Sequence, residues 1–388
     1  MIRNNSATQP LRVALVVPHI FIIREIMNDV IFSPGVLALQ LAKNLAQFDI
    51  DVTLLTPGPT ETEVKNITAD MSNFEQELKN RGYGYIELLK KHPLVFVSLA
   101  RQVQAEIIAR AYGMANQGDF DVVHIYTNEE DIALHFARFC RMPVVFTHHD
   151  PYNFLIKYKA VFPRYKHLNY ISMSQAQRQD MPPDTNWVAN IYHGADPDEF
   201  KPRYEKGDYF AYMGRIIEPK GVDRAISAVK LHNRNNPDAP VKLKIAGKHY
   251  AGYGKDDYWR EQIEPNLDEN VEYLGFIRDT EQLKFLQNAH ALLMPSRFSE
   301  PFGMAAIESL ACGTPVIGSS SGAIPEIVRP GKNGYIADTP KEISMAMKKI
   351  DQIDRHFCRH DFEERFTSER MAREHADLYQ KMTRENVK

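Results

Sequence analysis

The amino-acid sequence predicts an α/β protein with two doubly wound, Rossmann-like domains. Short runs of apolar and β-branched residues, such as residues 13–17 and 122–125, alternate with segments of helical spacing. This is the pattern of a parallel sheet covered by helices. The alternation stops in a loop-rich stretch and restarts at Tyr209. A length of 388 residues also agrees with two domains, at roughly 150 residues each.

The first half of the chain supplies the elements of one domain. Ser33 and Pro34 are expected to be the N-cap and the first-turn proline of a helix. The apolar face of that helix consists of Val36, Leu37, Leu41, Leu45 and Phe48. Buried strands are expected at residues 13–17, 52–55, 122–125, 144–146 and 170–172, with a helical pattern at 132–139.

Residues 66–93 fit this series less well. They mix Glu, Lys and Gly with aromatic residues at helical spacing. We interpret them as an excursion packed on the first domain; the alternative is a mobile flap over a substrate.

The second series of strands belongs to a second domain. Its strands are expected at residues 209–213, 243–246, 271–274, 291–294 and 315–317. The loop-rich residues 191–206 are interpreted as the interdomain linker. This places the domains at residues 1–190 and 207–367. Residues 368–388 form a polar helix pattern whose apolar stripe is Met371, Leu378 and Met382.

Composition excludes several classes of protein. Forty-seven basic and fifty acidic residues leave a net charge of −3, so no overall field attracts nucleic acid or an anionic membrane. No run of apolar residues is long enough to span a bilayer, and the polar N-terminus lacks a signal core, although peripheral membrane contact stays open. Three scattered cysteines, Cys140, Cys312 and Cys358, give neither a disulfide framework nor a zinc cluster. A reducing, cytoplasmic location is expected.

The common phosphate-binding motifs are missing from the sequence. The first strand is followed by Pro18, His19 and Ile20 rather than by G-x-G-x-x-G, which disfavours a dehydrogenase. No G-x-x-x-x-G-K-[ST] loop of the ATP- and GTP-binding kind occurs either.

A different phosphate-binding arrangement begins at Gly214. This glycine ends a strand, Arg215 and Lys220 follow, and a helix begins near Gly221. Glycine allows close backbone approach, and the two cations and the helix dipole favour an anion such as a diphosphate. The alternative is a surface loop with two solvated cations.

Two carboxylates accompany the next strand end. Glu300 lies in a turn, and Glu308 lies in the helix that follows Gly303, where the small residues 303–306 leave the helix start open. Carboxylates accept hydrogen bonds from vicinal hydroxyls, so the pair suits a sugar nucleotide. The alternative is a solvated turn and a surface helix.

Together these motifs resemble the retaining glycosyltransferases of family 4, which have the GT-B architecture of two Rossmann-like domains facing each other across a cleft. The resemblance covers most of the chain. It rests on G-R-x4-K-G at 214–221, on the E-x7-E pair Glu300 and Glu308, and on the linker string 193–200. The runs C-G-T-P-V at 312–316, G-A-I-P-E at 322–326 and G-K-N-G at 331–334 complete it.

The resemblance implies roles for individual residues. Arg215 and Lys220 would bind the donor diphosphate beside Gly214, Glu308 the nucleotide ribose, and Glu300 the hydroxyls of the donor sugar. The backbone around the next three residues would support that sugar: Phe302, Gly303 and Met304. His149, in the string T-H-H-D at 147–150, would face the transferred sugar; from the residues alone, a loop histidine bonded to backbone is the alternative. Residues 368–388 would cross back onto the first domain.

Weaker candidates come from the first domain. Asp150 is interpreted as a helix N-cap and Tyr152 as a wall of the cleft. Family members often carry Gly-Gly after the first strand, whereas here only Gly35 remains and Val36 follows it. His19 or the loop after it is therefore a further candidate for acceptor contacts.

The resulting expectation is a metal-independent, retaining hexosyltransferase without a cofactor. Its donor would be a nucleoside-diphosphate sugar such as a UDP- or GDP-sugar, and its acceptor an unidentified sugar, lipid or small molecule. The D-x-D string Asp196 to Asp198 lies in the linker and not in a strand-end loop. The alternatives are a related sugar-nucleotide epimerase, a phosphorylase, or a nucleotide-sugar-binding protein without turnover.

Overall fold

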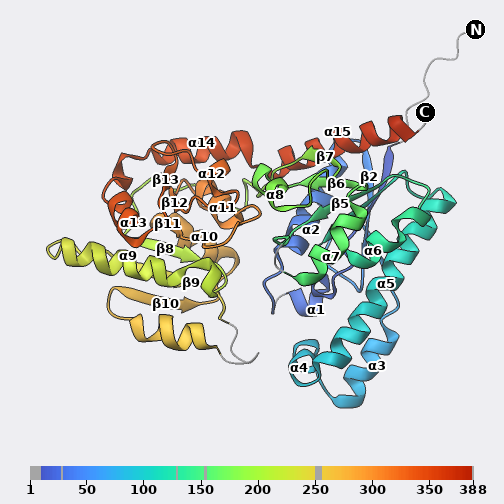
Figure 1. The fold of residues 1–388 in the computed structure, drawn as a ribbon, viewed down its shortest axis with the longest axis horizontal. Helices are drawn as coiled ribbons and strands as arrows, with labels where there is room; N and C mark the ends of the chain where they lie inside the picture. The colour runs from blue at the N-terminus through green and yellow to red at the C-terminus, as the bar shows by residue number, and fades with distance from the viewer. Residues whose placement is uncertain (1–9, 28, 128–129, 153–154, 250–255, 387–388) are drawn as a thin grey trace, which may run out of the picture. The chain divides into compact units, whose positions relative to one another are not determined.

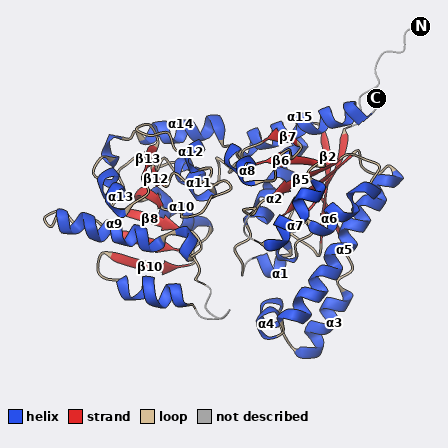
Figure 2. Ribbon diagram, viewed as in Figure 1, coloured by secondary structure: helices blue, strands red, loops and turns tan. Residues whose placement is uncertain are grey.

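The computed structural model describes residues 10–27, 29–127, 130–152, 155–249 and 256–386 (Figure 1). The chain forms two compact units. Unit 1 contains residues 1–172, 181–191 and 369–388, and unit 2 contains residues 173–180 and 192–368. Figure 2 shows strands flanked by helices in each unit, which is the predicted α/β class.

Unit 1 is built on a parallel sheet that has seven strands in the described part of the chain, in the order β3-β2-β1-β4-β5-β6-β7. The register pairs Val13 with Val52 on one side of β1 and with Val122 on the other. The strands are β1 (Leu11–Val16), β2 (Ile50–Thr56), β3 (Lys65–Thr68), β4 (Val122–Thr127), β5 (Val144–His148), β6 (Asn169–Ser172) and β7 (Trp187–Asn190). Since β1 lies between β2 and β4, strand order reverses there, and the ends of β1 and β4 flank the switch point.

Helices pack on this sheet, and some of them extend beyond its edge. The helices are α1 (Arg24–Met27), α2 (Ser33–Leu45), α3 (Ser72–Arg81), α4 (Tyr85–Lys91), α5 (Pro93–Gln117), α6 (Asp131–Phe136) and α7 (Ile156–Tyr165), with short 3₁₀ turns η1 (Ile20–Ile22), η2 (Ala46–Phe48) and η3 (Ala137–Phe139). In Figure 1, α3, α4 and the start of α5 extend beyond the sheet. Phe74 of α3 and Leu88 of α4 are fully buried in the core of unit 1, so residues 66–93 pack on this unit.

The start of α2 differs from the prediction. Phe32, and not Ser33, is the N-cap residue, and Ser33 is already helical. Phe32 is held outside the helix because its ring stacks on His19 at 4.7 Å between centroids. Val36, expected on the buried face, is 47% exposed, whereas Leu37 and Leu41 are buried.

The C-terminal helix α15 (Ser368–Asn386) belongs to unit 1 from Glu369 onward. Its Tyr379 hydroxyl lies 2.7 Å from Nδ1 of His124 in β4, and Nε2 of the same histidine lies 2.8 Å from Oγ1 of Thr147 in β5. All three side chains are buried. A buried polar chain of this kind loses much of its stabilisation when one member is removed, so it fixes α15 to the sheet.

Unit 2 is built on a second parallel sheet, of order β10-β9-β8-β11-β12-β13 in the part of the chain that the structure describes. Its strands are β8 (Tyr209–Met213), β9 (Leu243–Ala246), β10 (Val271–Gly275), β11 (Ala289–Met294), β12 (Val316–Gly318) and β13 (Gly334–Ile336). Its helices are α8 (Gln175–Asp180), α9 (Val222–Asn235), α10 (Asp279–Gln287), α11 (Met304–Ala311), α12 (Ile324–Ile327), α13 (Pro340–Met347) and α14 (Arg355–Arg365). The shorter turns are η4 (Glu218–Lys220), the π-helical η5 (Trp259–Ile263), η6 (Glu264–Asn266) and η7 (Ile350–Gln352). Here the order reverses between β8 and β11.

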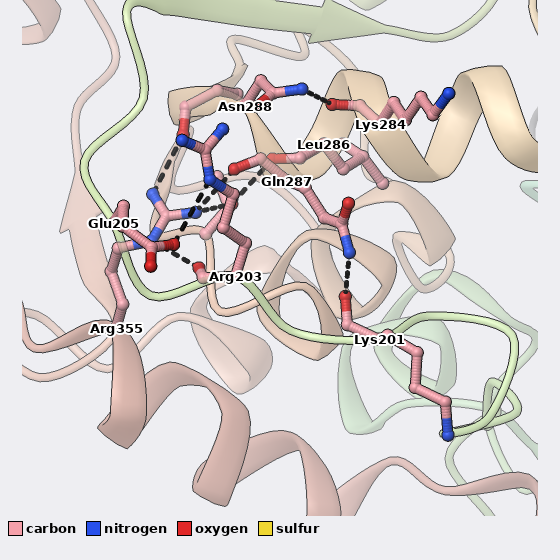
Figure 3. A network of polar contacts seen from close by, with 10 residues as sticks. Lys201, Arg203, Glu205, Lys284, Leu286, Gln287, Asn288 and Arg355 are labelled. Atoms are coloured by element: carbon pink, nitrogen blue, oxygen red, sulfur yellow. Dashed lines mark hydrogen bonds and ion pairs between the residues drawn. The ribbon is translucent and has the colours of Figure 1, made fainter.

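Most of the segment interpreted as a linker is held against unit 2. Two arginines one turn apart on α14 bind its carbonyl oxygens: Arg355 donates to the carbonyl of Arg203 at 3.0 Å, and Arg359 to that of Phe200 at 2.6 Å. Gln287 donates to the carbonyl of Lys201 at 2.7 Å, and Figure 3 shows this network around Arg355. The chain from Pro197 to Arg203 is therefore a fixed part of unit 2.

Residues 173–180 also group with unit 2, although the sequence placed them within 1–190. The carboxylate of Glu326 accepts hydrogen bonds from the amides of Gln175 and Ala176 at 2.9 and 2.7 Å, and Ser174 donates to the carbonyl of Pro301 at 2.7 Å. Charge-assisted bonds to the amides that open α8 are strong contacts, which explains the grouping.

An added side chain at Gly194 should lower the stability of the folded protein. A Cβ there would lie 2.3 Å from the carbonyl oxygen of Thr367, because the neighbouring Ala195 pairs with this segment. We expect Gly194→Ala to destabilise unit 2 by about 1–3 kcal/mol, as overpacking does, and to lower its melting temperature in calorimetry.

The matched control is Gly113→Ala in α5, where nothing lies within 4 Å of an added Cβ. That change should be neutral or stabilising by about 0.5–1 kcal/mol, because Gly is a poor helix former. Equal melting temperatures for the two variants would contradict the close packing at Gly194.

Candidate functional site

The loop after β8 brings Lys220 to the end of the sheet in unit 2. Gly214 ends the strand with φ 155°, η4 carries Lys220, and Gly221 with φ 72° is the N-cap of α9. A Cβ on Gly221 would lie 2.1 Å from the carbonyl oxygen of Pro295, which follows β11. Only glycine combines this left-handed backbone with such a close approach, so the loops after β8 and β11 are in contact.

The contact places Glu300 against Lys220. The ammonium of Lys220 lies 2.7 and 3.0 Å from the two carboxylate oxygens of Glu300, and both side chains are largely buried. Gly322 approaches Glu300 so closely that a Cβ would lie 2.2 Å from its amide nitrogen. Glu300 is thus fixed from the backbone side while its carboxylate holds Lys220.

Arg215 differs from Lys220 because no described residue bonds to its guanidinium. Its carbonyl accepts a hydrogen bond from Tyr212 at 3.0 Å. Its guanidinium forms no hydrogen bond or ion pair with other residues that the structure describes, and the side chain is partly buried. It can therefore bind an anion without first breaking a protein contact.

Glu308 projects from α11, the helix that starts after Gly303. Nε2 of Gln282 in α10 donates to its carboxylate at 2.9 Å. Burial raises the pKa of Glu308 to about 7, the amide of Gln282 opposes this, and Glu199 adds to it. The carboxylate is consequently close to half ionised at neutral pH.

The side chains of Phe302 and Met304 pack inside unit 2, which leaves their main chains as the groups that could contact a donor sugar. The Phe302 ring is buried beside Tyr192 and His193, and Met304 packs against the core of unit 2. Gly303, with φ 121°, is the N-cap of α11, which has no side-chain cap. Amides in the first turn of such a helix are oriented to bind an acceptor.

In unit 1, His149 follows β5. Its Nδ1 lies 3.2 Å from the carbonyl oxygen of Thr127, and its ring packs on Tyr126 at 4.4 Å. A carbonyl only accepts, so Nδ1 carries the proton and Nε2 is the acceptor. Burial lowers the pKa of His149 to about 3, which makes it a neutral imidazole at physiological pH.

The residues next to His149 in the sequence make contacts within unit 1. His148 points to the opposite face of the strand, where its Nδ1 lies 2.6 Å from Glu130. Asp150 is not a helix N-cap, since α7 starts after Leu155; it accepts a hydrogen bond from Tyr158 at 3.0 Å instead. Tyr152 packs near Phe162, against the core of unit 1.

His19 and Gly35 come together around Phe32. Nδ1 of His19 accepts from the amide of Phe21 at 3.2 Å, and its ring stacks on Phe32. A Cβ on Gly35 would lie 2.7 Å from the same Phe32 ring. The small size of Gly35 thus has a packing reason, independent of any ligand.

The structure brings Lys220 and Glu300 together at the switch point of unit 2, with Arg215 in the same loop as Lys220. Glu308 lies further along, in α11, where it contacts Gln282. The structure places His19 and His149 at the ends of β1 and β5 in unit 1. The sequence missed Gln282, which carries no motif, and Arg297, which lies within the string 295–301 and could have been found there.

Among the described residues, no His, Cys, Asp and Glu side chains gather in threes to hold a metal ion. Nor does any helix in those ranges have the length and apolarity needed to cross a bilayer. A cavity of about 650 Å³ in unit 2 is lined by Arg203, Tyr209, Lys244 and Lys284, among others, and by none of the predicted site residues.

Two family models match consecutive parts of the chain. Residues 35–198 match the one described as Glycosyltransferase Family 4, and residues 196–359 the one described as Glycosyl transferases group 1. The site residues of unit 2 all lie within the second match.

Individual relatives agree with these matches. The D-inositol 3-phosphate glycosyltransferase of Pseudarthrobacter chlorophenolicus is 30% identical over 146 residues, which are 38% of this chain and 32% of that protein. An uncharacterized glycosyltransferase of Methanocaldococcus jannaschii is 25% identical over 321 residues, 71% of this chain and 79% of that one. A second glycosyltransferase of the same archaeon is 32% identical over 166 residues, which are 43% of that protein. The matched segment thus makes up less than half the length of this relative and of the Pseudarthrobacter protein.

Solved structures agree on the fold. The Anabaena protein HepE, crystallised in complex with UDP-glucose, superposes with a TM-score of 0.64 at 16% identity, covering 97% of this chain and 99% of that one. The likeness confirms the predicted GT-B fold class of two Rossmann-like domains. With consecutive family matches over both units and the predicted motifs in place, the chain belongs to the glycosyltransferases of family 4, group 1.

Proposed function

We propose that the protein transfers a hexosyl group from a nucleoside-diphosphate sugar to an acceptor, with retention of configuration and without a metal ion. The observation that carries the proposal is the Lys220–Glu300 pair at the carboxyl ends of β8 and β11, with Arg215 in the same loop and Glu308 in the helix that follows β11. Strand order reverses between these two strands, and such a switch point is where open α/β sheets bind ligands.

The cations suit the diphosphate. Arg215 is available to bind an anion at once, whereas Lys220 is held by Glu300. A diphosphate would share Lys220 with Glu300, and the freed carboxylate oxygen would accept from a hydroxyl of the donor sugar. Negative charge grows on the diphosphate as the sugar leaves, so Arg215, Lys220 and the start of α9 would lower the barrier electrostatically.

This arrangement also supports metal independence. In many enzymes a divalent ion neutralises the leaving diphosphate; here two side-chain cations would do so. The UDP-glucose complex of HepE supports the same class of donor for this chain.

Unit 1 would bind the acceptor and contribute His149. Since Nδ1 of His149 donates to Thr127, its Nε2 is an acceptor for a hydroxyl of the transferred sugar. A neutral imidazole with a pKa of about 3 is a weak base. The acceptor proton would therefore pass to the leaving phosphate oxygen, on the face where the acceptor attacks.

The two cations can be tested by nucleotide binding. Arg215→Ala and Lys220→Ala should each weaken binding of UDP or GDP, whichever binds the wild type, by about 1.5–3 kcal/mol, because each removes a charge-assisted bond to phosphate. Calorimetry would show this as about a tenfold to hundredfold higher Kd.

The matched control is Lys341→Ala, which removes an exposed cation of α13 in the same unit. It should leave the Kd unchanged. Wild-type affinity in both site variants would show that the diphosphate is not bound at this loop.

The raised pKa of Glu308 predicts a pH dependence of donor binding. Ribose hydroxyls donate to the ionised carboxylate, so affinity for a nucleotide sugar should rise by up to about tenfold between pH 6 and pH 8. A nucleotide sugar is the right probe because, unlike a free diphosphate, it has no phosphate group titrating in this range. Glu308→Gln should remove the pH dependence, and Glu300→Gln should keep it.

The folding stability of the ligand-free protein should fall as the pH rises, whereas the affinity for the donor should increase. The folded pKa of about 7 lies above the ordinary value of 4.5, so the folded state binds more protons and stability is lost as pH rises between these values. Glu308→Gln should therefore raise the melting temperature more at pH 8 than at pH 5. A Glu308 variant with the wild-type profile in both assays would contradict its assignment.

Stereochemistry tests the reaction itself. Proton NMR of the first-formed product should show the anomeric coupling of the donor, because inversion needs a base that deprotonates the acceptor behind the sugar, and His149 is unsuited to it. The reaction should proceed in excess EDTA. An inverted product would overturn the mechanism, and activity that requires added manganese or magnesium would overturn metal independence.

A reaction without acceptor is the control. It should leave the sugar unchanged, whereas an epimerase would convert the donor in the absence of any acceptor.

A further inference from the structure

Arg297 holds the turn that carries Lys220. Its backbone amide donates to the carbonyl of Pro219 at 2.7 Å, and its Nη1 donates to the carbonyl of Glu218 at 2.9 Å. Both acceptors belong to η4, the turn that ends at Lys220. The residue therefore holds this turn from its main chain and its side chain together.

The guanidinium of Arg297 is itself held by Asp223. Nη1 lies 2.7 Å from one carboxylate oxygen of Asp223, and Nη2 contacts the other. Asp223 stands in the first turn of α9, three residues after Lys220. This parallel two-bond geometry is the most directional ion pair available to a protein, and it ties the start of α9 to the loop after β11.

Tyr258 completes the cluster. Its hydroxyl donates to Asp223 at 2.6 Å and accepts from the backbone amide of the same residue at 3.1 Å. Burial raises the pKa of Asp223, but the bonds from Arg297 and Tyr258 outweigh burial and hold the pKa below its ordinary value. The carboxylate is thus ionised at neutral pH.

The residues that follow Arg297 reach Lys220 directly. The ring of Phe298 lies 5.1 Å from the Lys220 ammonium, and Glu300 holds the same group through both oxygens. Arg297 therefore fixes the backbone that carries Lys220, while Phe298 and Glu300 fix the ammonium at its tip.

We propose that Arg297 and Asp223 are positioning residues for the diphosphate, which act through Lys220 and do not bind phosphate themselves. The inference rests on the proposed function, because it assigns Lys220 to the diphosphate. It also distinguishes the cations near the switch point: the guanidinium of Arg297 is bonded to Asp223 and Glu218, whereas that of Arg215 bonds to no other residue that the structure describes.

The mechanism is preorganisation. A lysine side chain has many rotamers, and ordering it on binding costs affinity. With η4 fixed by Arg297, the Lys220 ammonium is already in place before phosphate arrives. Loss of the Arg297–Asp223 pair should therefore weaken binding of phosphate and leave contacts with the base and ribose intact.

The test is a double-mutant cycle on nucleotide affinity. Arg297→Ala should raise the Kd of UDP or GDP, whichever binds the wild type, by about tenfold, but by less than about twofold when Lys220→Ala is already present. Affinity for the corresponding nucleoside, uridine or guanosine, should stay unchanged in all variants. Asp223→Asn, which keeps the shape and removes the charge, should reproduce the diphosphate effect.

Arg260→Ala is the matched control, since it removes an exposed Arg–Asp pair from the same unit, with Nη2 of Arg260 2.7 Å from Asp257. It should not change either affinity. Circular dichroism and the melting temperature check that each variant is folded, and Arg297→Lys, which keeps the charge but not the two-bond geometry, should fall between wild type and Arg297→Ala.

Three results would overturn the proposal. Losses from Arg297→Ala and Lys220→Ala that multiply would show that Arg297 acts independently of Lys220. An equal loss of nucleoside affinity would show a general structural role, and wild-type affinity in both Arg297→Ala and Asp223→Asn would show no role. If Lys220→Ala alone has no effect on diphosphate binding, the proposed function itself fails, and the inference with it.

Discussion

The contact between Gly221 and the carbonyl of Pro295 is the constraint on which the candidate site in unit 2 depends. It brings the loops after β8 and β11 so close that no side chain fits between them. The Lys220–Glu300 pair and the bonds from Arg297 to η4 all span this contact. Any residue other than glycine would have to separate the loops and would break all of these contacts together. A single position without a side chain thus sets the geometry of several charged groups.

The two units use buried polar groups in different ways. In unit 1, His124, Thr147 and Tyr379 form a chain that ties the C-terminal helix to the sheet, and burial lowers the pKa of His124 and of His375 beside it. These histidines are neutral structural groups. In unit 2, Arg355 and Arg359 use their charge to fix the carbonyls of the chain that enters the unit.

Strands in the middle of a sheet were predicted, whereas most of the edge strands were not. β1, β4, β8 and β11 are buried in the middle of a sheet and were predicted from their apolar runs, whereas the edge strands β3, β7 and β13 were missed. The edge strand β10 was predicted, although its residues alternate between buried and exposed. Motifs predicted Lys220 and Glu300 separately, but not the ion pair that joins them across 80 positions. The Arg297–Asp223 pair and the attachment of residues 173–180 depend on tertiary contacts that leave no local pattern. Sequence could not reveal the proton position on His149 either, because it depends on the carbonyl of Thr127.

The placement of α15 in unit 1 has a consequence for synthesis of the chain. Unit 1 starts with the first strand, yet its buried residues include Tyr379, which follows the whole of unit 2 in the sequence. Domains generally fold as units as the chain emerges from the ribosome. Unit 2 has all its residues once Ser368 has emerged, whereas unit 1 must leave the buried face of β4 uncovered until α15 has emerged as well. The unit that is made first is therefore the one that is completed last.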